Sequence, residues 1–374
     1  MITHIQLKKF KCFSDESFDI APLTLFTGIN GMGKSSVIQS LVLLRQSYES
    51  TLLQTKAKVD LFNHSYINLE SASDLCNYNA YPKSVEIIAE SSVTGKHHWT
   101  IDASKPKDTV LDVVYEGNYN LENEALFKSD FIYLTAERFG PRKSYNRKVE
   151  RVFNTKLGVQ GELTPTYISD AIKNNDNIGI ENLKHHTLRS FQLYENLNAW
   201  LSEILGRNIT AKVTEIDQEN VKLSFNLKGT RGGDFSALQV GFGFSFSLPV
   251  ILAPLIAKPG DLLIIENPEA HLHPSAQAKI GKLLALAAQN GVQIIIESHS
   301  DHLLNGIRLI VKGDETFGKL DPGKVIIHFF NTELQDEAGN FVKRTLKISP
   351  KGKLDGWPNG FFDEWESNLR KLLK

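Results

Sequence analysis

The chain has 374 residues, of which 41% are hydrophobic and 23% are charged, and its formal net charge is -1. This composition excludes an intrinsically disordered chain, and the near-zero charge excludes a global basic field, so any DNA contact needs a local patch. Cys12 and Cys76 give no disulfide framework, and no apolar run reaches the roughly 20 residues of a membrane span. Residues 1–10 lack the apolar core of a signal peptide. We therefore expect a cytoplasmic protein.

The first predicted elements lead to a glycine-rich loop. The alternation of apolar residues predicts strands over 2–8, 16–20 and 23–27, then the loop 28–33 and a helix from 34 to about 47. Residues 28–35 read Gly-Ile-Asn-Gly-Met-Gly-Lys-Ser, the full G-x-x-x-x-G-K-[ST] phosphate-binding pattern between a strand and a helix.

Each residue type in this loop suits a nucleotide triphosphate. Glycines let backbone N–H groups approach the phosphates, and the positive end of the following helix faces them. A lysine neutralises the β- and γ-phosphates, and a serine binds Mg²⁺. We therefore predict that ATP and Mg²⁺ are bound, with Ser35 as the metal ligand. The predicted nucleotide-binding residues of the loop are Asn30, Gly31, Gly33, Lys34, Ser35 and Ser36.

The middle of the chain has a mixed pattern. It predicts strands over 85–90, 110–115 and 131–135, a helix over 188–205 and a hairpin of 209–215 with 221–227. After the strand at 131–135, Arg138 or Arg142 either contacts a nucleotide across a dimer or belongs to an ion-paired loop, and the pattern leaves both readings open. A solvated face is favoured over a phosphate-binding patch for the basic run Arg142, Lys143, Arg147, Lys148 and Arg151.

The last third alternates helices and strands. We predict helices over 239–257 and 275–289, and a further helix near 301. The predicted strands are 262–266, 292–297, 324–330 and 344–348, and the final helix begins at Asp363. Sustained heptads are absent from the sequence, which argues against long coiled-coil arms.

An acidic residue ends the apolar strand predicted at 262–266. A phosphate-binding loop needs such a residue to hold Mg²⁺ through water, and Glu266 supplies it. The residues that follow, 267–274, read Asn-Pro-Glu-Ala-His-Leu-His-Pro, with a second acidic residue at Glu269. His299 comes just after the next strand, where it can reach a γ-phosphate.

These motifs, in this order, resemble the ABC-type ATPase heads of the RecF, SMC and OLD (overcoming lysogenisation defect) class. The resemblance rests on the loop at 28–35, Val240-Gly241-Phe242-Gly243-Phe244-Ser245, and the stretches 266–274 and 297–302. The tail Trp357-Pro358-Asn359-Gly360-Phe361-Phe362-Asp363 is similar to one prokaryotic group of AAA-family ATPases whose C-terminal segment has unknown function. Septu and OLD proteins belong to antiphage gene cassettes, which implies a defence role by analogy.

The resemblance implies roles for further residues. In ABC heads a glycine-rich signature loop caps the γ-phosphate of the opposite subunit. Gly241, Gly243 and Ser245 match that loop, with Ser245 as the expected donor, while Phe246 stands where relatives carry glutamine. Asn267 occupies the position of the glutamate that orients the attacking water. Because an amide cannot accept a proton, help must come from Glu269, from His299 or from neither. We therefore predict slow hydrolysis and a long-lived ATP-bound dimer.

The predicted fold is an α/β P-loop NTPase of the ABC-ATPase head type. It has a mostly parallel core sheet, an N-terminal antiparallel lobe and an inserted helical lobe at about 161–205. The whole chain, 1–374, is predicted to be one head. Its parts are the N-terminal strands and loop at 1–48, an inserted β/helical lobe at 49–235, the signature loop, acidic strand and histidine at 236–331, and a C-terminal segment at 332–374.

Three functions agree with this sequence. The first is a slow ATPase that dimerises on ATP, or forms a higher oligomer, and switches a separately encoded effector such as a nuclease in antiphage defence. The second is a RecF-like repair ATPase that binds DNA directly. The third is a scaffold that binds ATP without hydrolysing it, which Asn267 would favour.

Overall fold

The computed structural model describes residues 1–62, 66–77, 83–147, 155–229, 233–335, 341–362 and 364–373, without the side chains of 332–335, 341–342 and 364–367. Lys148, Arg151 and Asp363, which the sequence analysis named, lie outside the described residues. The contacts divide the chain into two units. Unit 1 comprises Met1–Lys128, Val325–Ser349 and Lys353–Lys374, and unit 2 comprises Ser129–Lys324 and Pro350–Gly352.

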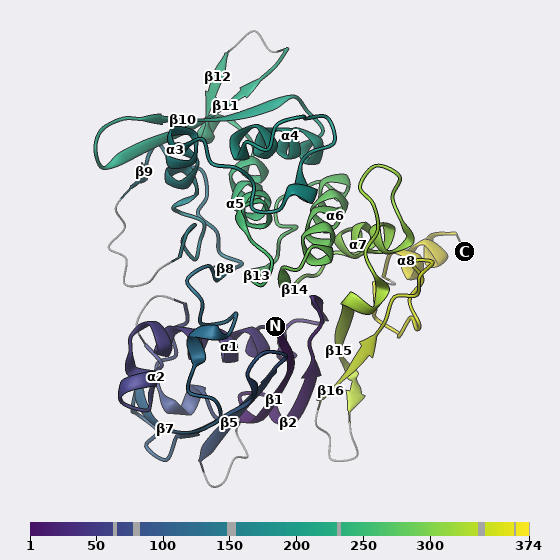
Figure 1. The fold of residues 1–374 in the computed structure, drawn as a ribbon. Helices are drawn as coiled ribbons and strands as arrows, with labels where there is room; N and C mark the ends of the chain where they lie inside the picture. Colours follow the sequence, from purple (N-terminus) through teal and green to yellow (C-terminus); the bar gives the residue numbers. More distant parts are fainter. Residues whose placement is uncertain are drawn as a thin grey trace. The chain divides into compact units, whose positions relative to one another are not determined.

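An antiparallel sheet forms one layer of unit 1 (Figure 1). Its strand order is β2-β1-β5-β6-β7-β4. Alternate residues in the middle of β1 face the interior, which is why Ile5 and Leu7 are fully buried while their neighbours are partly exposed. The strands are β1 (Ile2–Phe10), β2 (Phe13–Asp19), β4 (Lys58–Asp60), β5 (Ser84–Ser91), β6 (Gly95–Asp102) and β7 (Val110–Glu116).

The glycine loop of unit 1 follows β3, which belongs to a second group of strands. β15 (Val325–Gln335) pairs in parallel with β3 (Leu23–Gly28) and antiparallel with β16 (Phe341–Leu346). α1 (Lys34–Glu49) begins where the loop ends, and α2 (Leu52–Thr55) follows it. The strand and helix predicted on either side of the loop are thus confirmed. The final helix is α8 (Glu364–Leu372).

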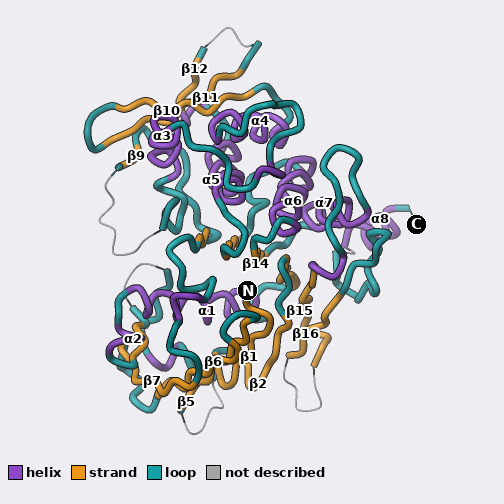
Figure 2. The backbone as a smooth tube through the Cα atoms, viewed as in Figure 1, coloured by secondary structure: helices purple, strands orange, loops and turns teal. Residues whose placement is uncertain are grey.

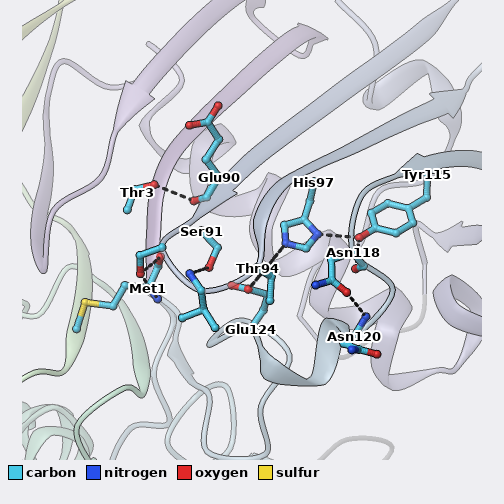
Figure 3. A network of polar contacts seen from close by, with 12 residues as sticks. Met1, Thr3, Glu90, Ser91, Thr94, His97, Tyr115, Asn118, Asn120 and Glu124 are labelled. Atoms are coloured by element: carbon cyan, nitrogen blue, oxygen red, sulfur yellow. Dashed lines mark hydrogen bonds and ion pairs between the residues drawn. The ribbon is translucent and has the colours of Figure 1, made fainter.

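A buried polar network closes the β5–β6 hairpin (Figure 3). Nδ1 of His97 lies 2.7 Å from the hydroxyl of Tyr115, and its Nε2 lies 2.5 Å from Oγ1 of Thr94, which also hydrogen-bonds Glu124. Burial alone would raise the pKa of Glu124, but hydrogen bonds from His97, Thr94 and Ser91 outweigh it and lower that pKa to about 2. The network ties the hairpin turn to residues 115–124 and so has a structural role.

A neutral histidine lies in the core of unit 1. His328 on β15 is fully buried, its Nε2 donates to the carbonyl of Asp19 at 2.8 Å, and its ring stacks on Phe26 at 5.3 Å between centroids. Burial lowers the pKa of His328 from 6.5 to about 4.

We predict that unit 1 loses stability in acid through His328. Because its folded pKa is depressed, the unfolded chain binds the proton first, so the stabilisation is complete above pH 6.5 and is lost as the pH falls towards 4. The loss is up to about 3 kcal/mol. His328→Gln keeps a neutral donor and should flatten the fall of the thermal midpoint between pH 6.5 and 4, measured by calorimetry. His302→Gln, at a side chain 44% exposed, is the control and should leave that fall unchanged.

Three parallel strands form the centre of unit 2. β13 (Leu262–Glu266) pairs in parallel with β14 (Gln293–Glu297) on one side and with β8 (Ile132–Leu134) on the other. Residues 262–265 are fully buried, as a strand covered on both faces requires. In the sequence, α5 (Phe242–Ile256) precedes β13, α6 (Pro274–Gln289) lies between β13 and β14, and α7 (Asp301–Lys312) follows β14.

The helices α6 and α7 lie against each other at glycine contacts. A Cβ at Gly281 on α6 would lie 2.2 Å from the carbonyl oxygen of Leu303, and one at Gly306 on α7 would lie 1.9 Å from that of Ala278. Each glycine therefore admits the backbone of the other helix. This close pairing fixes the loop between β14 and the start of α7.

The rest of unit 2 is a small antiparallel sheet with two helices against it (Figures 1 and 2). Its strands are β9 (Tyr145–Asn146), β10 (Ile209–Glu215), β11 (Asn220–Leu227) and β12 (Asp234–Ser236), and the helices are α3 (Thr164–Asn174) and α4 (Leu193–Leu205). The predicted hairpin is confirmed, whereas the helix predicted from 188 begins at Leu193.

Single 3₁₀ turns occur in both units, at Ala72–Asp74, Leu121–Asn123, Glu181–Leu183, Ala237–Gln239 and Pro322–Lys324. Over the described residues, helices fall short of the length and apolarity needed to cross a membrane.

Candidate functional site

The glycine loop of unit 1 is wrapped closely against its neighbours. Gly28 has φ 126°, and a Cβ there would lie 2.0 Å from the carbonyl oxygen of Phe330. Gly33 has φ 96°, and a Cβ there would lie 2.5 Å from Sγ of Cys12. A side chain at either position would require both a disfavoured backbone angle and a steric overlap. The sequence pattern therefore needs glycine here for the path of the backbone.

The middle of the loop is open. Asn30 and Gly31 are exposed, and a Cβ at Gly31 would meet no atom within 4 Å. The first turn of α1 follows, with Gly33 as its N-cap, no side-chain cap and no acidic residue. The positive end of the α1 dipole therefore lies at this loop, where it favours an anion.

Lys34 brings a cation into this loop. Its side chain is 3% exposed, and Nζ donates to the carbonyl oxygens of Ile29 at 2.7 Å and Gly28 at 3.1 Å. Ser35 and Ser36 are half-buried beside it. A buried lysine, the start of a helix and two serine hydroxyls are the groups that fit phosphate and its Mg²⁺.

The acidic residue of unit 2 is held from both sides of its carboxylate. Glu266 ends β13, where Oε1 accepts the hydroxyl of Tyr133 at 2.9 Å and Oε2 accepts the N–H of Ala136 at 3.2 Å. Burial raises the pKa of Glu266, although these hydrogen bonds and the charge of Arg138 oppose the rise. The sequence predicted the strand that carries Tyr133 but not its contact with Glu266, because 133 positions separate the two residues.

Arg138 is a buried residue of the same unit. It is 4% exposed, and its guanidinium donates to the carbonyl oxygens of Thr135 at 3.2 Å, Glu266 at 2.6 Å and Asn267. Burial lowers its pKa to about 10, opposed by the charges of Glu269 and Glu266. The structure packs this side chain against the end of β13, a position that neither reading of the sequence had specified.

Arg142 and Arg147, the other described arginines of this segment, have their own partners. The guanidinium of Arg142 lies 4.6 Å from the centroid of Phe139. Arg147 pairs with Asp170 at 2.9 Å and with Glu215. These contacts agree with the solvated, ion-paired reading for the described part of the basic run.

The turn after β13 brings three of the predicted residues together. Asn267 has φ 44°, a left-handed conformation that asparagine tolerates, and its N–H donates to the carbonyl of Glu297 at 2.8 Å. Two residues on, Oε1 of Glu269 accepts the N–H of His299 at 2.8 Å. Oδ1 of Asn267 and Oε2 of Glu269 are buried and make no hydrogen bond to the described residues.

The signature-like loop lies at the start of α5. A Cβ at Gly243 would lie 2.6 Å from the carbonyl oxygen of His271, so this glycine allows α5 to approach the turn after β13. Gly241 is exposed and Phe242 is 57% exposed. Ser245 was expected to reach another subunit, but it is only 5% exposed in this structure. The exposed part of the loop therefore consists of Gly241 and Phe242.

The predicted site residues thus form two groups. Unit 1 gathers Asn30, Gly31, Gly33, Lys34, Ser35 and Ser36 at one loop. Unit 2 gathers the acidic, amide and histidine residues at the end of β13 with the loop before α5, namely Glu266, Asn267, Glu269, His299, Gly243 and Ser245.

Comparison with protein families gives two matches. The family described as "AAA domain, putative AbiEii toxin, Type IV TA system" matches residues 23–305. A family described as a protein of unknown function matches residues 320–372, in agreement with the resemblance of the tail. No curated protein matches the sequence.

Solved structures show what the fold is similar to. An SMC head bound to the C-winged helix domain of ScpA is 10% identical with a TM-score of 0.55, covering 93% of this chain and 98% of that one. An SMC head domain with an extended coiled coil, bound to the C-terminal domain of ScpA derived from Pyrococcus furiosus, is 11% identical with a TM-score of 0.53, covering 100% and 99%. At this identity the likeness shows the fold alone, an SMC-head-like α/β fold.

Proposed function

The chain belongs to the AAA-domain family that matches residues 23–305, and from this premise we propose that it is a slow ATPase of the ABC-head type that dimerises on ATP. The observation that carries the proposal is the glycine loop, where buried Lys34 begins α1 next to the exposed residues Asn30 and Gly31. Such a loop binds the triphosphate of a nucleotide.

Each residue of the loop has a proposed role. Backbone amides of Asn30, Gly31 and Gly33 surround the phosphates, Lys34 neutralises their charge, and Ser36 adds a hydroxyl. Ser35 and Glu266 would hold Mg²⁺, which, when bound, neutralises the charge that develops on the phosphates. The carboxylate of Glu266 is already held by Tyr133 and Ala136, as a residue with that role requires.

Slow turnover follows from the residue after Glu266. Asn267 presents an amide where faster ABC ATPases carry a carboxylate, and an amide cannot take a proton from the attacking water. The ATP-bound state would therefore persist, which suits a switch.

Dimerisation would place the loop before α5 over the nucleotide of a second subunit. The N–H groups around Gly241 and Gly243 would contact the γ-phosphate, and the helix dipole of α5 favours that anion. The hydroxyl of Ser245 would have to turn outward before it could donate. The dimer would close because these contacts exist only in the closed state.

Substitution of Gly241 separates this role from folding. A Cβ at this N-cap position meets no atom within 4 Å, and φ is −62°. Gly241→Asp therefore leaves folding intact, since aspartate is a favoured N-cap residue, but places a negative charge against the γ-phosphate. We expect this variant to bind ATP normally and to remain monomeric with ATP and Mg²⁺, by sedimentation.

The control for that experiment is Gly241→Ala. It adds no charge, so it should dimerise with ATP as the unaltered protein does. If Gly241→Asp dimerised equally well, the proposed position of this loop over the second nucleotide would be wrong.

The partner that such a dimer would control is a separately encoded effector, such as a nuclease in antiphage defence. Support comes from the family description, which names a Type IV TA system, and from the solved SMC heads, which are bound to domains of ScpA. A scaffold that binds ATP without hydrolysis is the second candidate, favoured by Asn267. Turnover that Lys34→Ala abolishes would reject the scaffold. Strong salt-dependent DNA binding would instead favour a RecF-like ATPase.

A further inference from the structure

We propose that Arg138 is a positioning residue that sets the turn after β13 so that Glu269, and not His299, orients the attacking water. This inference rests on the proposed ATPase function. The roles of Glu269 and His299 were open in the sequence, and no motif pointed to a role for Arg138 inside its own protomer. The contacts within unit 2 supply both.

The first step concerns what Arg138 holds. Its guanidinium donates to the backbone carbonyls of Glu266 and Asn267, which are the last residue of β13 and the first residue of the turn. A third donation, to the carbonyl of Thr135, fixes the arginine to the end of β8. Hydrogen bonds from a charged donor are strong, and a planar fork restrains two carbonyls at once. Arg138 therefore fixes where the turn begins.

The second step concerns why the turn needs such support. Asn267 adopts φ 44° and His271 adopts φ 61°, so two non-glycine residues of this short segment are left-handed. Such conformations persist only when the surroundings enforce them. Arg138 supplies part of that enforcement, because it binds the carbonyl of Asn267 itself.

The third step separates Glu269 from His299. Oε1 of Glu269 is occupied by the N–H of His299, which orients the carboxylate, and Oε2 is buried without a hydrogen bond to the described residues. A carboxylate held at one oxygen keeps the other for accepting a proton from water, and Oε2 would have to turn out of its buried position to do so. His299 contributes its backbone N–H to this arrangement, so its exposed side chain is not needed to hold Glu269.

The fourth step links Arg138 to the signature-like loop. The guanidinium lies 5.8 Å from the ring centroid of Phe246, and that ring meets His271 at 4.6 Å. Phe246 belongs to α5. The ring centroid of Phe242, one turn earlier in this helix, lies 5.6 Å from that of His271. The residue that replaces the glutamine of relatives thus packs against the arginine that holds the turn.

The test uses the full chain with Arg138→Lys, Arg138→Met, Glu269→Gln and the double variant Arg138→Lys/Glu269→Gln. We expect each single variant to lower kcat roughly 10–100-fold, while affinity for the slowly hydrolysed analogue ATPγS changes less than about threefold. ADP–vanadate, which mimics the transition state, should lose affinity in step with kcat. The double variant should be no slower than Glu269→Gln alone, because the two residues act as one unit.

Several outcomes would overturn this inference. The first is that the losses of kcat in the two single variants multiply in the double variant. The second is that a variant loses ATPγS affinity and kcat by equal factors. The third is that Glu269→Gln keeps a normal kcat while His299→Ala has a low one. If Arg138→Met does not fold, the kcat values of Arg138→Lys and Phe246→Leu test the inference instead. The thermal midpoints of these variants show whether they are folded. A protein that binds ATP but neither hydrolyses it nor binds ADP–vanadate would also overturn it. Loss of ATP binding in the unaltered protein would instead refute the proposed function.

Discussion

Lys34→Ala is expected to lower the affinity for ATP at least about 100-fold, equivalent to roughly 2.7 kcal/mol, and to reduce hydrolysis to background. Lys34 is 3% exposed, and its ammonium donates to the carbonyl oxygens of Gly28 and Ile29 within the loop. In such a poorly hydrated place its attraction for phosphate is much stronger than at a surface. Calorimetric titration with ATP and Mg²⁺ measures the loss.

Lys58→Ala is the matched control for this prediction. Lys58 lies on β4 of the same unit and pairs with Asp112 at 2.6 Å on an exposed surface. Its removal changes the net charge by the same amount and should leave ATP affinity within about twofold, because surface pairs contribute little. Equal losses in the two variants would mean that Lys34 acts only through overall charge.

Gly306→Ala is expected to destabilise unit 2 by about 2–3 kcal/mol and to lower its thermal midpoint by about 5–10 °C. The added methyl carbon would lie 1.9 Å from the carbonyl oxygen of Ala278, so α7 must move away from α6. Because this contact involves backbone, a change of rotamer cannot relieve it. The measurement is the thermal midpoint of Gly306→Ala by calorimetry. Gly241→Ala is the control, because its added methyl group meets no neighbour, and the difference between the two variants gives the effect of the clash.

The same displacement should reach the turn after β13. α7 begins at Asp301, two residues after His299, whose N–H holds Glu269. A shift of α7 would therefore lower kcat in Gly306→Ala more than it lowers ATP affinity. A midpoint unchanged by this substitution would contradict the close pairing of α6 and α7.

The elements set by local patterns were predictable from the sequence. The strand and helix around the glycine loop, β13 and α6 all lie within one or two residues of their predicted bounds. These segments combine a clear period of apolar residues with a loop, proline or acidic residue at the end. β6 was missed, because Lys96, His97 and His98 give its first half a polar composition, and the burial of His97 depends on Tyr115 and Glu124.

The site could be predicted only where a motif describes it. The loop at 28–35 and Glu266 follow from spacing, whereas Tyr133 and Arg138 act on Glu266 across more than 120 residues of sequence. Such a contact leaves no local pattern. The burial of Ser245 is also a tertiary property, since it depends on how α5 packs.

Calorimetric titration of the purified protein with ATP, in the presence and absence of Mg²⁺, tests the central claim most directly. The account predicts saturable binding that strengthens with Mg²⁺, because Lys34, Ser35 and the amides of the glycine loop bind the triphosphate with its metal. A protein that releases no heat with ATP at any Mg²⁺ concentration, and whose thermal midpoint ATP does not raise, would contradict it.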